Sequence, residues 1–191
     1  MFGIFLDTET NGLNAFKHRA LEIAFRITNI LTGEVVASYE TIIQVDKKDW
    51  ELSDPASLQI NGFTYEKTAQ GKSSSQVAQE VQLLFKKHNI QRGSSVFICQ
   101  NPSFDRSFFA QLISPELQES LNWPYHWLDL ASMYWVDSLR KGRENPAYYP
   151  WVTGISKNKI AVAYHLPEEK TPHRAMNGVD HLILCYKAVV K

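Results

Sequence analysis

The alternation of side chains between positions 21 and 28 limits the fold more than any other feature of this sequence. The apolar members are Leu21, Ile23, Phe25 and Ile27. A period of two is typical of a β-strand with one buried face. A turn at residues 31–34 follows, and alternation resumes over 35–43, while a short apolar run over 3–6 comes first. The pattern predicts three consecutive strands in an antiparallel meander.

Helical spacing dominates the rest of the chain. After a serine-rich cap, helical spacing relates Val77, Val81, Leu84, Phe85 and His88, and Val96–Cys99 is expected to be a buried strand. A helix opens at Pro102 or Ser103, and further elements are expected as a helix over 117–121, a short strand passing into a helix over 126–130, and a helix over 157–165. The last helix has an apolar stripe formed by Val179, Leu182, Ile183, Tyr186 and Val190.

Two segments are predicted to be loops: 46–72, which is polar and irregular, and 141–156, which is rich in glycine, proline, tyrosine and tryptophan. No repeat or linker divides the chain. We therefore expect one domain over residues 1–191, of the α/β class, with helices packed on a mixed sheet.

Charge and composition exclude several classes of protein. The 20 basic and 20 acidic residues balance, which argues against a protein that coats DNA in bulk. Cys99 and Cys185 each lie in an apolar run without a CxxC pair, so we expect buried free thiols and no zinc site. No signal peptide and no apolar run of membrane-spanning length are present, so a cytoplasmic protein without a membrane partner is expected.

Asp7 and Glu9 stand two residues apart at the end of the first predicted strand. Alternation places both carboxylates on one face, where they repel each other unless a cation lies between them. Oxygen ligands of this kind suit Mg²⁺ or Mn²⁺. The plainer interpretation is an exposed strand end with two solvated acids.

Two further segments contain candidate catalytic residues, and each is informative only in combination with Asp7 and Glu9. Asp105 opens a helix in the segment Asn101–Asp105, where an acid also favours the positive end of the helix dipole. His173 precedes the last helix in the segment His173–Ala175, and a histidine there can act as a general base near neutral pH.

Together these segments resemble the DnaQ-like exonucleases of the RNase H-like fold, in the histidine (DEDDh) branch. The resemblance rests on the motif DTETNGL at residues 7–13, on Asn101 with Phe104-Asp105, and on His173-Arg174-Ala175, in the family's order. It covers the chain from residue 3 to the last helix. It implies a mixed five-stranded sheet with flanking helices and a 3′→5′ exonuclease that uses two Mg²⁺ or Mn²⁺ ions.

The resemblance also assigns roles. Asp7, Glu9 and Asp105 match the metal-binding carboxylates, and His173 matches the general base. Thr8 and Thr10 point away from the acids if the strand is regular. The predicted substrate contacts are Thr8, Thr10, Asn11, Gly12, Leu13, Asn101 and Phe63.

The sequence departs from the family at its fourth acid. The family's motif H-x-A-x-x-D places this acid at position 178, which is glycine here, and the nearest acid is Asp180. If the last helix began near Val179, after the turn signal Asn177-Gly178, Asp180 could replace the missing acid. We expect this arrangement, with Asp180 as a metal ligand. If the helix instead ran unbroken from Ala175, Asp180 would face away.

The substrate is expected to be a single-stranded 3′ end, of DNA or RNA. Aromatic side chains can stack terminal bases without reading sequence. The candidates are Phe16, Phe63, Tyr65, Tyr148, Tyr149 and Trp151. Phe63 and Trp151 also suit anchors in a core.

Two rival functions stay open at this stage. A scaffold or nucleic-acid-binding module that has lost catalysis, associated with a polymerase, is suggested by Gly178. A two-metal endonuclease on a related sheet is disfavoured by His173 before the last helix. Further expected partners are a DNA polymerase and a second copy of the chain.

Overall fold

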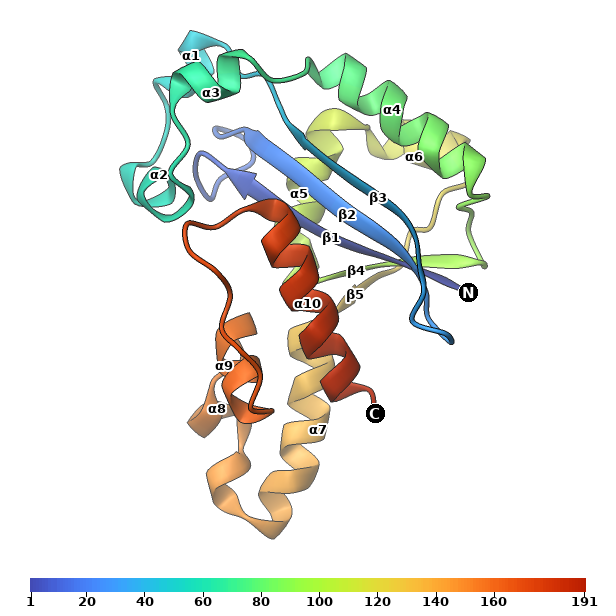
Figure 1. Cartoon of the computed structure of the whole chain (residues 1–191), viewed down its shortest axis with the longest axis vertical. Coiled ribbons are helices and arrows are strands. Elements are labelled where there is room, and N and C mark those ends of the chain that lie inside the picture. The colour runs from blue at the N-terminus through green and yellow to red at the C-terminus, as the bar shows by residue number, and fades with distance from the viewer.

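The computed structural model describes the whole chain, residues 1–191, and builds it around one twisted sheet (Figure 1). The strands are β1 (Phe2–Thr10), β2 (Ala20–Asn29), β3 (Val35–Ile42), β4 (Ser95–Cys99) and β5 (Trp127–Asp129). Their order is β3-β2-β1-β4-β5. The first three strands pair antiparallel, and β1, β4 and β5 run parallel. The predicted meander and the mixed five-stranded sheet are therefore confirmed.

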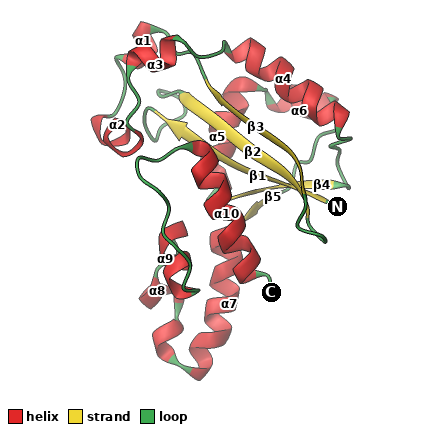
Figure 2. Ribbon diagram, viewed as in Figure 1, coloured by secondary structure: helices red, strands yellow, loops and turns green.

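Helices cover both faces of the sheet (Figure 2). They are α1 (Lys47–Trp50), α2 (Pro55–Asn61), α3 (Tyr65–Ala69), α4 (Ser74–Lys87), α5 (Pro102–Leu112), α6 (Pro115–Ser120), α7 (Leu130–Glu144), α8 (Pro150–Thr153), α9 (Lys157–Ala163) and α10 (Ala175–Val189), with a 3₁₀ turn at Pro146–Tyr148. None of them combines the length and the apolar character that crossing a membrane requires.

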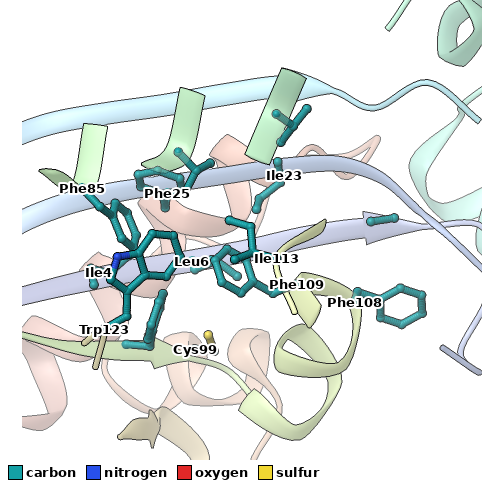
Figure 3. Packing of buried hydrophobic residues seen from close by; sticks show 14 of the residues in the cluster. Ile4, Leu6, Ile23, Phe25, Phe85, Cys99, Phe108, Phe109, Ile113 and Trp123 are labelled. Atoms are coloured by element: carbon teal, nitrogen blue, oxygen red, sulfur yellow. The ribbon is translucent and has the colours of Figure 1, made fainter. Parts of the chain in front are cut away.

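Side chains on the two faces of β1 pack into two separate hydrophobic cores. Ile4 and Leu6 point towards α4 and α5, where Phe85 and Phe109 also pack (Figure 3). Phe5 points to the opposite face, against α10, α7 and α9. Because side chains alternate along a strand, this division also decides which layer each polar residue at the end of β1 will face.

The segment 46–72 was predicted to be a loop, and this prediction is wrong. It forms α1, α2 and α3, each begun by a side-chain cap from Asp46, Asp54 or Thr64. Caps and not periodicity start these helices, because each helix is too short to show a repeat. The segment 141–156 likewise contains the 3₁₀ turn and α8 within its predicted loop.

The start of α10 was also predicted wrongly. The helix begins at Ala175 and runs through Asn177 and Gly178, so the expected turn at these two residues does not form. Glu22 holds the first turn in place, since its carboxylate accepts a hydrogen bond from the backbone N–H of Ala175 at 2.8 Å. Both cysteines are buried free thiols, as predicted.

Candidate active site

Strand β1 carries the first two acids into the centre of the molecule. It runs to Thr10, four residues beyond the apolar run that predicted it, so Asp7 and Glu9 lie within the strand and not after it. Both face the α10 layer, like Phe5 two residues earlier. Thr8 faces the other layer, where its hydroxyl donates to Asp105 at 2.8 Å. Thr8 therefore points away from its two neighbours but contacts the third acid.

Asp105 reaches the site from the first turn of α5 and is buried there. The bend before the helix is set by Asn101, whose φ of 57° lies in the left-handed region that asparagine tolerates. Its backbone N–H donates to the carboxylate of Asp129 at 3.0 Å, which also caps α7. The ends of β4 and β5 thus fix the entry of α5, and with it the position of Asp105.

His173 comes from the loop before α10. Its backbone N–H donates to the carbonyl of Ile60 at 3.2 Å, and Arg174 donates to the carbonyl of Asn61 at 2.8 Å. Two hydrogen bonds, one from His173 and one from the next residue, therefore hold this loop against α2. The imidazole Nδ1 lies 4.0 Å from the carboxylate of Glu169, four residues earlier.

These side chains meet in one cavity of about 290 Å³. It is lined by Asp7, Thr8, Glu9, Gln100, Phe104, Asp105, Ser156, Lys157, Asn158, Glu169 and His173. A larger cavity of about 790 Å³ lies beside α1 and α3 and contains none of the predicted catalytic residues. The smaller cavity is the candidate active site, because it contains the side chains that could bind a metal ion and transfer a proton.

Buried acidic side chains lie close together in the cavity, and this raises the pKa of three of them. Burial raises the pKa of Glu9 to about 8, and repulsion from Asp7 and Glu22 adds to the shift. Burial, followed by repulsion from Asp7, raises the pKa of Asp105 well above its usual range. Burial also raises the pKa of Asp7, although the ammonium of Lys157 opposes it. Carboxylates held this way favour a cation among them.

Lys157 and Glu169 are the site residues that the sequence did not predict. The Lys157 ammonium lies 3.2 Å from Asp7 Oδ1 and 3.1 Å from Glu169 Oε2. Neither residue belongs to a recognisable motif: Lys157 opens a short helix, and Glu169 stands in an irregular polar segment. Glu22 was likewise missed, because it reads as the polar member of an alternating strand.

Asp180 does not join the other carboxylates, which corrects the expectation that it replaces the missing acid. Its oxygens accept from Arg26 at 2.6 and 3.0 Å, on β2, and its side chain is 51% exposed. The reason is the early start of α10: position 178 faces the cavity, and position 180 therefore points elsewhere.

Several predicted substrate contacts also need correction. Phe63 is buried in a small core with the Arg174 guanidinium 4.5 Å above its ring, so it offers no face to a base. Asn11 is fully buried, and its side chain binds Asp49 and Ser53. Thr10 donates to the carbonyl of Gly12 at 2.8 Å.

The other predicted contacts differ in their surroundings. Leu13 is 75% exposed, and Asn101 is exposed beside the start of α5. Gly12 is buried against His18. Thr8 alone among the predicted substrate contacts lines the 290 Å³ cavity. Substrate binding by Leu13, Asn101 and the backbone at Gly12 stays a prediction.

The donor set suits a hard divalent cation. Asp7, Glu9, Asp105 and Glu169 supply only carboxylate oxygens, which Mg²⁺ and Mn²⁺ prefer. As the side chains stand, no group of three or more histidine, cysteine, aspartate or glutamate residues is gathered closely enough to hold a metal ion. Lys157 already occupies the space between two of the carboxylates.

The fold and the site together define a nuclease-type domain, and the sequence agrees. Residues 4–181 match the RNase T exonuclease family, and the chain belongs to that family. This confirms the resemblance to the DnaQ-like exonucleases. No curated protein matches the chain.

Solved structures of exonucleases share the fold. Escherichia coli exonuclease I in complex with a dT13 oligonucleotide is similar over 97% of this chain and 40% of its own, with 16% identity and a TM-score of 0.68. Cell-death related nuclease 4 (CRN-4) is similar over 99% of this chain and 63% of its own, with 11% identity and a TM-score of 0.75. A 3′-exonuclease that recognises the 3′ end of the histone mRNA stem-loop gives 13% identity and 0.70, over 97% of this chain and 62% of its own. The chain thus spans less than two thirds of each.

Proposed function

We propose that this protein is a metal-dependent exonuclease that removes nucleotides from the 3′ end of single-stranded nucleic acid. One observation carries the proposal: Asp7, Glu9, Asp105 and His173, from three distant parts of the sequence, line the same cavity. The 3′→5′ direction is supported by the family resemblance and by the activity that the name of one structural neighbour states.

Each residue has a role in the proposed reaction. Asp7, Glu9 and Asp105 would hold the divalent cation, which, when bound, neutralises charge on the phosphate and lowers the pKa of the attacking water. His173 would accept the proton of that water as the general base. The carboxylate of Glu169 stands 4.0 Å from its Nδ1.

Single-stranded DNA and single-stranded RNA are both candidate substrates. Among the similar structures, exonuclease I was solved with oligodeoxynucleotides, and the 3′-exonuclease recognises a histone mRNA stem-loop. Association with a DNA polymerase and formation of a homodimer stay predictions.

A second candidate function is a scaffold that binds nucleic acid without cutting it. The specific observation in its favour is Gly178, which leaves the family's fourth carboxylate position without a side chain. A protein of this kind would bind single strands and release no nucleotide.

The test is incubation of the purified protein with 5′-labelled single-stranded DNA and, separately, RNA, with Mg²⁺ or Mn²⁺ and with EDTA. We expect a ladder that shortens from the 3′ end and no cutting of a circular single strand. Asp105→Asn should abolish the ladder. This variant keeps an oxygen for the Thr8 hydroxyl, so the fold is retained while a metal ligand is weakened.

Asp180→Asn is the matched control, because it makes the same chemical change outside the cavity. Binding of both strands without any cutting would leave the scaffold as the function. Fragments from the circular strand would indicate an endonuclease instead.

A further inference from the structure

We propose that the ammonium group of Lys157 takes the place of one divalent cation, so that the site binds one metal ion where the family resemblance implies two. This inference rests on the proposed function, since it concerns the same cavity. It assigns to Lys157 and Gly178 a joint role in deciding how many ions the protein holds.

The position of the ammonium is the first observation. Lys157 Nζ lies 3.2 Å from Asp7 Oδ1, 3.1 Å from Glu169 Oε2 and 3.3 Å from the carbonyl oxygen of Gly178. Oxygens from three segments therefore surround it, two of them from carboxylates. A cation held between such oxygens neutralises part of their charge, as a metal ion would, although it carries one charge and cannot acidify a water by coordination.

Gly178 is the second observation. The resemblance places the fourth metal-binding carboxylate at this position, and a Cβ built here would lie 2.1 Å from Asp7 Oδ2 and 3.0 Å from Lys157 Nζ. A carboxylate at 178 would therefore project onto the spot that the ammonium occupies. An acid at 178 and the ammonium would compete for the space beside Asp7, and the missing side chain leaves that space to the lysine.

The lysine is also held in place. Its side chain is 11% exposed and that of Glu169 is 4% exposed, so the ion pair is buried. Helix α9 begins at Lys157 and is capped by Ser156, which fixes the direction from which the side chain enters. Two largely buried carboxylates, those of Asp7 and Glu169, provide its counter-charge.

One position for a metal ion remains. Glu9 and Asp105 form no ion pair with a lysine or arginine, and both carboxyl groups are held close to Asp7. They supply oxygen ligands next to Asp7 that no ammonium or guanidinium group occupies. One divalent ion there, together with the ammonium, would set three positive charges against the four carboxylates that line the cavity.

The test counts Mn²⁺ ions per chain from the signal of free Mn²⁺ in electron paramagnetic resonance. The wild-type protein, saturated with a nucleoside 5′-monophosphate, should bind one ion. The double variant Lys157→Ala, Gly178→Asp removes the ammonium and restores the acid, and it should bind two. Lys159→Ala is the matched control: it removes an exposed lysine of the same helix, and the count should stay at one.

The wild-type count decides the matter even if the double variant does not fold. Two ions, or none, bound to the wild-type protein would overturn the inference. The count also separates a failure of the inference from a failure of the proposed function. One ion bound without any release of nucleotides would reject the exonuclease and leave the substitution of ion by lysine intact.

Discussion

Positions 178 and 180 show how strictly a helix assigns roles to single residues. Two steps along a helix turn a side chain by about 200°, so an acid at one position cannot replace an acid at the other. Gly178 faces Asp7, whereas Asp180 pairs with Arg26 on the flank of the helix. The missing fourth carboxylate is therefore not recovered by its nearest neighbour in sequence.

Asp180→Asn is expected to leave the nuclease rate unchanged. The pair with Arg26 is half exposed, and exposed ion pairs contribute about 0–1 kcal/mol, so the free energy of unfolding should fall by at most that amount. Urea unfolding and the strand-shortening assay measure both effects. A large loss of rate in a stable variant would contradict the position found for Asp180.

His173→Asn should lower kcat by a factor of about 10²–10⁴, the usual contribution of a general base. Mn²⁺ binding should persist, because the predicted ligands Asp7, Glu9 and Asp105 are unchanged. Single-turnover rates together with Mn²⁺ binding measure the two effects separately. An unaltered rate would assign proton transfer to another group, and loss of the metal would make His173 a ligand.

Among the helices and strands, the sequence predicts those with a clear apolar repeat and does not predict boundaries that depend on tertiary contacts. The meander, α4 and α5 were predicted because their apolar residues repeat with the right period. The start of α10 was missed because Asn177-Gly178 is a turn signal in isolation. Here the glycine is required inside a helix by the closeness of Asp7 and Lys157, and local sequence does not encode that closeness.

The candidate site divides in the same way. Asp7, Glu9, Asp105 and His173 lie in motifs and were predicted. Lys157 and Glu169 come from segments without a motif, and only tertiary packing brings Lys157 to Asp7 and Glu169 to Lys157. Phe63 was misassigned because an aromatic residue in an apparent loop gives no sign of whether its ring is covered.

Helix α10 also contains a pH-sensitive group, His181. Burial lowers its pKa below the ordinary value, and its ring faces Glu169 at 3.9 Å, the carbonyl of Pro167 at 2.9 Å and Cys185. The folded protein therefore binds this proton less readily than the unfolded chain. The contribution of neutral His181 to the free energy of unfolding is fully present above the unfolded pKa of about 6.5. It is lost as the pH falls below that value.

His181→Gln should flatten this dependence, since glutamine can still donate to Pro167 but does not titrate. The measurement is the midpoint of thermal unfolding between pH 7.5 and 5 for both proteins. We expect the wild-type midpoint to fall further than that of the variant. Equal declines would show that other groups set the acid sensitivity.

At the scale of the whole molecule, three aromatic rings, those of Trp135, Tyr149 and Trp151, form a cluster that we call the aromatic corner. Trp151 is 63% exposed, and the ring of Tyr149 stacks on it at 4.4 Å with an angle of 12° between the planes. Trp135 of α7 lies 6.1 Å away. Helix α8, which contains Trp151, packs against α9, and Lys157 at the start of α9 lines the cavity. We therefore expect a long strand whose 3′ end is in the cavity to extend towards this corner.

Trp151→Ala should weaken the binding of long single strands and spare dinucleotides. Stacking of one base is worth about 1–3 kcal/mol, or roughly 5- to 150-fold in KM for a strand of ten nucleotides. Tyr125→Ala is the control, because this exposed ring precedes β5, at the opposite end of the parallel strands. Equal effects on short and long substrates would place the stacking surface elsewhere.

The contact between Gly178 and Lys157 also bears on how this cavity can change over evolutionary time. An acid introduced first at 178 would meet Asp7 and the ammonium without room for its Cβ. Loss of the lysine first would leave Asp7 and Glu169 buried without their counter-charge. Each single step leads through a less stable protein, so the two positions are bound by epistasis, and a lineage that has adopted this pair does not easily return.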